Sequence, residues 1–325
     1  MTVLDDYTLL VEEGLSQLTF PDSPRSLYDP CRYVMKNGGK RLRPVLTLMA
    51  SGLCGGNLED AVPAALSVEL IHNFTLVHDD IMDQASSRRG QPSVHVRWDE
   101  PTAILAGDML YAEAFQQLLC YSDAPGRRFQ HLQRTLLKAI RTVCEGQALD
   151  MKLEREKGGS VEEYLDMIRG KTAALISCSL KIGGISAGAS QEELQRLDLL
   201  GDKIGLAFQI QDDLMDAVAD PEKFGKTRGG DILEGKKTFL LLTALENGNE
   251  TDVRELYSVM DKDSLKGGDI DRVVHLFRKT GALKRARDTI GQEYRQAMEL
   301  LEPFDDSDYK ADLVTLLNFL IDREY

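Results

Sequence analysis

The sequence predicts an all-α protein that forms a single domain over residues 1–325. Apolar residues recur at helical spacing through most of the chain, and no segment shows a convincing alternation of apolar and polar residues, as a half-buried strand would. Two S-x-x-E segments, Ser160–Glu163 and Ser190–Glu193, have the pattern of capping boxes at helix starts. No linker rich in proline or serine divides the chain, so we expect one bundle of roughly ten or more helices.

Glycine pairs indicate where the first helices end. The segments Asn37-Gly38-Gly39 and Gly55-Gly56-Asn57 offer the left-handed conformation that commonly follows a helix. Helical apolar patterns then run through residues 58–82, 102–120 and 129–153. These patterns predict the long helices of the first half of the protein.

The two capping boxes begin the helices of the next part of the chain. We expect the helix that starts at Ser160 to stop at Gly183-Gly184. The helix from Ser190 should run to about Val218, ahead of Asp220-Pro221. Shorter helical patterns fill the remainder, at residues 237–246, 251–260, 269–279, 282–301 and 309–323.

Composition and charge restrict the class of protein. A chain with 42% hydrophobic and 28% charged residues is typical of a globular protein that folds in water. The net charge of −14 argues against nucleic-acid binding, so local clusters of Lys and Arg must meet any anionic ligand. No run reaches about 18 apolar residues, and the acidic N-terminus is unlike a signal peptide, so we expect no transmembrane segment. The five cysteines include no C-x-x-C pair, which favours reduced thiols and a cytoplasmic location.

Two aspartate clusters of the same form are the most informative feature of the chain. They are Asp79-Asp80-Ile81-Met82-Asp83 and Asp212-Asp213-Leu214-Met215-Asp216. On a helix, the first and fifth residues of such a motif lie one turn apart on one face. Crowded carboxylates raise one another's pKa, and Mg²⁺ relieves that repulsion while sharing its other positions with water and phosphate. The doubled motif therefore predicts a Mg²⁺-diphosphate site, and the alternative for each copy alone is a solvated acidic helix end.

Each acidic motif continues a polar stripe along its helix. His72 and Leu76 share the face of the first motif, and Gln209 shares the face of the second. A polar stripe on an otherwise apolar helix either faces water or lines an internal polar cavity. The sequence by itself leaves both alternatives open.

Basic residues gather beside the acidic motifs, at helix ends and turns. In an acidic protein such groups are what a diphosphate site needs, because Arg and Lys bind the anion directly. The alternative for any one group is a solvated run of charge. The groups are Lys40, Arg41 and Arg43 after the Gly38-Gly39 turn, Arg88 and Arg89 after the first motif, Lys171 within a helix, and Lys226, Lys236 and Lys237 after the second motif.

These motifs, in this order, resemble the trans-isoprenyl diphosphate synthases, or polyprenyl synthetases, over about residues 25–245. Together they are most like the short-chain geranylgeranyl diphosphate synthases. The resemblance implies an all-α bundle of the isoprenoid-synthase type around a deep central cavity, and a homodimer. The segments that carry it are Gly38–Pro44, His72–Asp83, Arg88–His95, Gly170–Ala173, Gln209–Asp216, Phe224–Lys226 and Glu234–Thr238.

The resemblance also implies two diphosphate subsites and a cofactor. The family uses three Mg²⁺ ions, and Mn²⁺ can substitute for them. Here the ions would bind Asp79, Asp83 and Asp212, and Asp80, Asp213 and Asp216 would support them. An allylic diphosphate would contact the metals and six side chains, Arg88, Lys171, Thr172, Gln209, Lys226 and Lys236. Isopentenyl diphosphate would lie on Lys40, Arg43, His72 and Arg89.

The implied reaction is ionisation of the allylic diphosphate, attack by the double bond of isopentenyl diphosphate, and loss of a proton. Phe74, together with the small Thr75, resembles the arrangement of enzymes that stop at the C20 geranylgeranyl product. Ile71 or a side chain on a facing helix is the alternative determinant of length, and Phe74 is then ordinary core packing. C15 and C25 or longer products remain alternatives. A class I terpene cyclase and a non-catalytic partner subunit are more distant ones, since both acidic motifs are intact.

Overall fold

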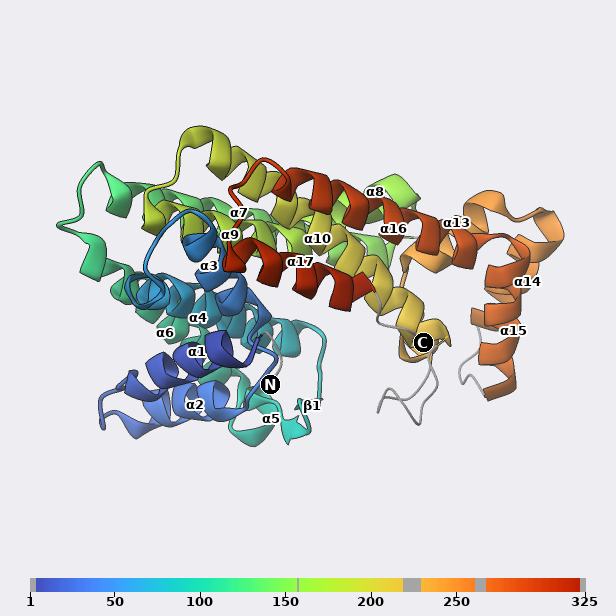
Figure 1. Ribbon diagram of the computed structural model, residues 1–325. Coiled ribbons are helices and arrows are strands. Elements are labelled where there is room, and N and C mark those ends of the chain that lie inside the picture. The colour runs from blue at the N-terminus through green and yellow to red at the C-terminus, as the bar shows by residue number, and fades with distance from the viewer. Residues whose placement is uncertain (1–3, 157, 219–228, 261–266, 322–325) are drawn as a thin grey trace. The chain divides into compact units, whose positions relative to one another are not determined.

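The computed structural model describes residues 4–156, 158–218, 229–260 and 267–321, and it is all-α apart from one tiny hairpin (Figure 1). The expected fold class is therefore confirmed. The contacts within the chain group its residues into two compact units. Unit 1 comprises Met1–Ile140, Leu175–Asp198 and Pro303–Leu316, and unit 2 comprises Arg141–Ala174, Leu199–Glu302 and Leu317–Tyr325. The single domain over residues 1–325 stays a prediction.

Unit 1 contains the N-terminal helices and the hairpin. Its elements are α1 (Asp5–Gln17), α2 (Arg25–Lys36), α3 (Leu42–Leu53), α4 (Leu58–Met82), β1 (Ser87–Arg88), β2 (Gln91–Pro92), α5 (Val94–Arg97), α6 (Glu100–Leu118), the 3₁₀ turn η1 (Leu119–Tyr121), most of α9 (Ala174–Ala187), the start of α7 (Arg128–Arg155) and of α10 (Gln191–Val218), and most of α17 (Asp308–Ile321).

Helix α4 is the centre of unit 1, where it packs against α6, α3 and α1. It begins at the N-cap Asn57, whose side chain accepts hydrogen bonds from the backbone N–H groups of Glu59 and Asp60. Its apolar side, which includes Leu70 and Ile71, is wholly buried. This packing fixes the direction of the polar stripe that leads to the first acidic motif.

The expected stop at Gly183-Gly184 is wrong, because α9 continues through both glycines to Ala187. A Cβ added at Gly183 would overlap the carbonyl oxygen of Thr47 on α3, and one added at Gly184 would press on Leu197. These glycines therefore allow two helices to approach closely rather than ending one. Helix α10 is described to Val218, and the expected stop ahead of Asp220-Pro221 lies outside the described residues.

Unit 2 contains the remaining parts of α7, α10 and α17 and the following elements: α8 (Val161–Ile168), the π-helical turn η2 (Arg169–Ala173), α12 (Gly230–Leu233), α13 (Phe239–Asn247), α14 (Glu250–Met260), α15 (Gly267–Lys279) and α16 (Ala282–Leu301). Helix α8 begins with the predicted capping box, in which Ser160 and Glu163 bond each other's backbone N–H. Helix α13 packs against α16 and α8. The ring of Tyr294 on α16 is wholly buried there, and its hydroxyl donates to Gln211 Oε1 at 3.2 Å.

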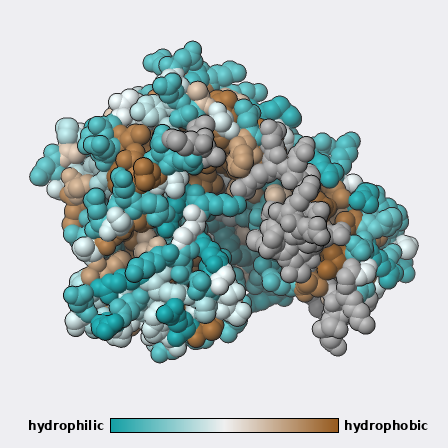
Figure 2. Space-filling view, turned by 60° about the horizontal axis from the view of Figure 1, so that its bottom comes forward, coloured by the Kyte–Doolittle hydropathy of each residue, from teal (hydrophilic) through white to brown (hydrophobic). Residues whose placement is uncertain are grey.

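The surface is that of a charged protein. The face in Figure 2 is largely hydrophilic, with hydrophobic side chains in scattered patches. Across the described residues, no helix combines the length and the apolar character that crossing a membrane requires.

Candidate active site

The first acidic motif occupies the last turn of α4. Asp79 is half-buried and Asp83 is exposed, and the Asp83 N–H donates to the Asp79 carbonyl at 2.9 Å, so the two lie one turn apart as predicted. Asp80 is different, because the residue is only 4% exposed and its side chain is held by Arg88. Arg88 donates to Asp80 Oδ1 from Nε at 2.8 Å and from Nη2 at 2.5 Å. Burial would lower the pKa of Arg88, but Asp80, Asp79 and Asp83 together raise it.

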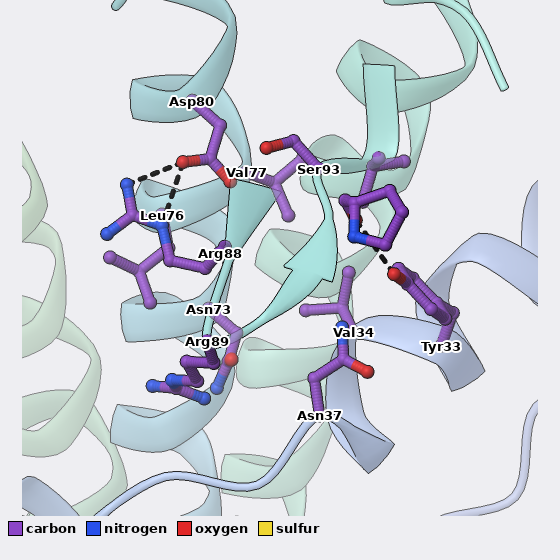
Figure 3. A pocket seen from close by; sticks show the side chains of 12 residues that line it. Tyr33, Val34, Asn37, Asn73, Leu76, Val77, Asp80, Arg88, Arg89 and Ser93 are labelled. Carbon is purple, nitrogen blue, oxygen red and sulfur yellow. Dashed lines mark hydrogen bonds and ion pairs between the residues drawn. The ribbon is translucent and has the colours of Figure 1, made fainter. Parts of the chain in front are cut away.

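The two-stranded hairpin after this motif separates Arg88 from Arg89. Arg89 and Gly90 both have positive φ, 53° and 74°, as in a type I′ turn between antiparallel strands. Figure 3 shows Arg88 bonded to Asp80 and Arg89 extending away from it. Arg89 donates to the Gly38 carbonyl oxygen. The Tyr33 hydroxyl ties the hairpin to α2 by donating to the Pro92 carbonyl at 2.7 Å. The sequence analysis missed this hairpin, although the x-Gly pair at its tip was a signal for it.

A basic cluster forms around His72, which lies on α4 about two helical turns before Asp79. Arg43 Nη1 lies 3.2 Å from His72 Nε2. Because a guanidinium has only donors, Nε2 must accept, and the ring proton is assigned to Nδ1. Burial, followed by Arg43 and Arg89, holds the pKa of His72 well below its usual range, so the ring is neutral near pH 7.

Arg43 is the cation of this cluster that lies against His72. Burial lowers its pKa to about 10, with Glu69 opposing the shift and Arg89 adding to it. Its Nε atom is buried and has no hydrogen-bond partner among the described residues. Three of the four residues expected to bind isopentenyl diphosphate, Arg43, His72 and Arg89, are therefore electrostatic neighbours. The fourth, Lys40, is exposed just before α3, the helix whose first turn contains Arg43.

The second acidic motif lies near the end of α10 in unit 2. Asp212 is exposed and Asp216 is half-buried, whereas Asp213 is 5% exposed. Asp213 accepts hydrogen bonds from three neutral donors, Tyr164 Oη at 2.6 Å, the Phe239 N–H at 3.1 Å and Gln209 Nε2 at 3.2 Å. Burial raises the pKa of Asp213 to about 7. Asp213 therefore joins α8, α10 and α13.

Lys171 and Thr172 lie on the π-helical turn η2. Lys171 Nζ is 2.5 Å from Asp150 Oδ2, and Thr172 Oγ1 donates to Gln209 Oε1 at 2.9 Å. Glycines bring α7 close to this turn, since a Cβ at Gly146 would overlap the Lys171 backbone N. Three predicted residues, Thr172, Gln209 and Asp213, thus form one hydrogen-bonded chain.

One acidic residue of this site was missed. Asp231 on α12 donates its backbone N–H to Asp216 Oδ2 at 3.0 Å, and burial, with Asp216 and Asp212 nearby, raises the pKa of its side chain to about 6. Lys236 Nζ lies 3.5 Å from Asp231 and 2.8 Å from Glu234. In the sequence, the only signal for Asp231 was that it is an acidic residue a short distance after the second motif. Lys226 lies outside the described residues.

The acidic side chains suit Mg²⁺, which shares its coordination with water and substrate, better than a metal that is coordinated by protein alone. Within the described ranges, no three carboxylate, imidazole or thiol side chains are grouped so that they could hold an ion by themselves. Mg²⁺ is commonly bound by one or two carboxylates, with water and substrate phosphates in its other positions. Asp79 with Asp83, and Asp212 with Asp216, are pairs of that kind.

The proposed chain-length residues lie on α4 in unit 1. The Phe74 ring packs edge-on against His78 and Tyr111, with centroids 4.9 and 5.5 Å away, and Tyr111 continues to Phe115 at 5.3 Å. The Thr75 hydroxyl donates to the His72 carbonyl at 2.8 Å. Ile71 is wholly buried. Phe74 thus belongs to an aromatic cluster of α4 and α6.

Comparison with known proteins places this chain in a family. The model of the polyprenyl synthetase family matches residues 24–277. A short chain isoprenyl diphosphate synthase of Methanothermobacter thermautotrophicus is 38% identical over 100% of this chain and 99% of its own length. A geranylgeranyl diphosphate synthase of Methanosarcina mazei is 37% identical, with 100% of this chain and 99% of that protein covered. A geranylfarnesyl diphosphate synthase of Natronomonas pharaonis is 36% identical over 97% and 95%.

Solved structures agree with the sequence comparisons. The crystal structure of a geranylgeranyl pyrophosphate synthetase from Pyrococcus horikoshii superposes with a TM-score of 0.92 at 36% identity, covering 99% of this chain and 97% of the other. The fold and the paired acidic motifs define an all-α prenyltransferase. The chain belongs to the polyprenyl synthetase family.

Proposed function

We propose that this enzyme condenses isopentenyl diphosphate with allylic diphosphates and releases chiefly the C20 product, geranylgeranyl diphosphate. The observation that carries the proposal is the hairpin of unit 1. It directs Arg88 to the first acidic motif and Arg89 to the cluster of Arg43 and His72. Two anion-binding groups are thereby adjacent, one beside carboxylates that suit Mg²⁺ and one in which arginines outnumber the single buried carboxylate, Glu69. Such a pair suits two diphosphates that must be held together.

The side chains have distinct parts in this reaction. Asp79, Asp83 and Asp212 would hold Mg²⁺, with Asp80, Asp213 and Asp216 in support. When bound, Mg²⁺ supplies positive charge to a departing diphosphate. Arg88 and Lys171 add charge-assisted hydrogen bonds to the same group. His72, neutral and bonded to Arg43 through Nε2, keeps its Nδ1–H as a donor for the second diphosphate.

The C20 product is supported by the relatives and by Phe74. Several relatives are named geranylgeranyl synthases, and two are named geranylfarnesyl synthases, so C25 is the principal alternative. Phe74→Ala should shift the product from C20 to C25 and longer, and Thr75→Phe should shift it towards C15. Phe319→Ala, which removes an exposed ring on α17, is the matched control. An unchanged distribution in Phe74→Ala would assign chain length to another residue, such as Ile71.

One assay tests the function as a whole. The purified protein is incubated with isopentenyl diphosphate, Mg²⁺ and a C5, C10 or C15 starter, and the products are sized. We expect elongation that stops mainly at C20. No elongation from any starter would contradict the proposal and favour a non-catalytic subunit, whereas a cyclic hydrocarbon product would favour a terpene cyclase.

Assembly and location complete the proposal. The family supports a homodimer, which sedimentation of the purified protein tests directly. All five cysteines are free in the structure, which suits a reducing compartment such as the cytoplasm.

A further inference from the structure

Arg41 lies between the two cations of its motif, Lys40 and Arg43, and the reaction described above gives it no role. Its backbone is left-handed, with φ 47° and ψ 27°, a conformation that residues other than glycine rarely adopt. The residue is 3% exposed and forms the N-cap of α3. Something must hold a long charged side chain in this buried, unfavourable conformation.

The partners of Arg41 are two glutamates and a carbonyl. Its Nη1 donates to Glu69 Oε1 at 2.5 Å, its Nε to Glu12 Oε1 at 2.7 Å, and its Nη2 to the Met35 carbonyl at 3.3 Å. Glu69 is 1% exposed, and the same oxygen accepts a hydrogen bond from Asn73 Nδ2 at 3.0 Å. A buried charge of either sign is costly without its partner, so Arg41 and Glu69 constrain each other strongly.

This ion pair joins the two elements that form the basic cluster. Arg41 is two residues before Arg43, and Glu69 is one helical turn before His72 on α4. The pair therefore ties the start of α3 to α4 next to the bond between Arg43 and His72. Glu69 also acts electrostatically on Arg43 and Arg89. One buried carboxylate thus holds together three arginines whose combined charge stays positive.

We propose that Arg41 and Glu69 are positioning residues for the diphosphate of isopentenyl diphosphate. The pair holds residues 38–43 in the conformation that brings Arg43 to His72 and leaves Lys40 exposed just before α3. The inference rests on the proposed function, because it assumes that this cluster binds that substrate. Glu12, whose side chain is 48% exposed, is a lesser partner and serves as an internal control.

The decisive variant is Arg41→Gly. Glycine adopts a φ of 47° without strain, so this change keeps the backbone conformation available while it removes the side chain and its guanidinium. We expect the KM for isopentenyl diphosphate to rise about tenfold or more, since small displacements of binding groups are costly. The KM for the allylic diphosphate should change less than about twofold, because Arg88 and the acidic motif are untouched.

Three further variants complete the test. Glu69→Gln should raise the same KM, Arg41→Lys should raise it less, and Glu12→Gln should leave it nearly unchanged. Melting temperature is measured for each, and if Arg41→Gly does not fold, Glu69→Gln and Arg41→Lys decide. Equal changes in both KM values, or a fall in melting temperature with both KM values preserved, would overturn the inference. A wild-type protein that elongates no starter would instead contradict the proposed function itself.

Discussion

The two acidic motifs share a sequence pattern and a buried second aspartate, yet they differ in what surrounds that aspartate. Asp80 and Asp213 are 4% and 5% exposed, and each lies next to an outer aspartate expected to bind metal. Asp80 is paired with the guanidinium of Arg88. Asp213 has no cation within bonding distance among the described residues, and is held by a tyrosine hydroxyl, a backbone N–H and a side-chain amide.

The difference shows that the buried second aspartate of a repeated motif can have two different structural roles. At the first motif the buried carboxylate is an electrostatic anchor for an arginine on a hairpin. At the second it is a hydrogen-bond acceptor that joins three helices, and burial without a countercharge raises its pKa to about 7. The outer aspartates, which both motifs leave more accessible, are the positions where the two copies should act alike.

The largest expected effect tests that likeness. Asp79→Ala and Asp212→Ala should each lower kcat by about a hundredfold or more, a typical loss for one group that stabilises charge in a transition state. Turnover at saturating Mg²⁺ is measured beside Asp305→Ala, which removes an exposed carboxylate. Full activity in excess chelator would show that the motifs do not act through a metal.

The next largest effect should show that the second aspartates of the two motifs have different roles. Asp80→Asn removes the charge that holds Arg88, and we expect kcat/KM for the allylic substrate to fall about tenfold, as for a lost hydrogen bond to a charged group. Asp213→Asn should cost less than about threefold in kcat/KM, because its three partners are neutral and their bonds are worth less. Equal losses in the two variants would mean that the second aspartates have the same role.

A third comparison concerns how each unit positions its cations, by a hairpin in unit 1 and by a π-helical turn in unit 2. Gly146→Ala should destabilise the protein by about 1–3 kcal/mol, as expected for overpacking, and raise the KM for the allylic substrate as Lys171 is displaced. Gly291→Ala on α16, where a Cβ meets only the end of the Arg295 side chain, should be neutral or slightly stabilising. Chemical denaturation and steady-state kinetics measure both.

The smallest effect is a pH dependence that belongs to unit 1. Since the pKa of folded His72 is held below its usual range, the unfolded chain binds more protons than the folded protein below about pH 6.5. The free energy of unfolding should therefore fall as the pH falls from 7 to 5. The melting temperature of His72→Gln should fall less over that range than that of the wild type. His275→Gln, which alters an exposed ring, should behave like the wild type.

The sequence by itself determined the helices and the identity of most of the candidate site residues. Helix α4 ends at its acidic motif, and the Ser160 capping box forms as written, because helix periodicity and capping depend on residues three or four positions apart. The motif order was enough to indicate the family. Phe74 was found by resemblance, and its role remains a prediction.

Only the tertiary structure decided the features that depend on distant partners. Gly183 lies inside a helix because α3 passes against it, and Arg89 turns from Arg88 because Arg89-Gly90 closes a hairpin held by Tyr33. Asp80 and Asp213, which hold the same place in their motifs, differ because Arg88 reaches one and Tyr164 the other. Periodicity records which face of a helix is polar, but the pKa and the role of a buried carboxylate depend on the groups that folding brings to it.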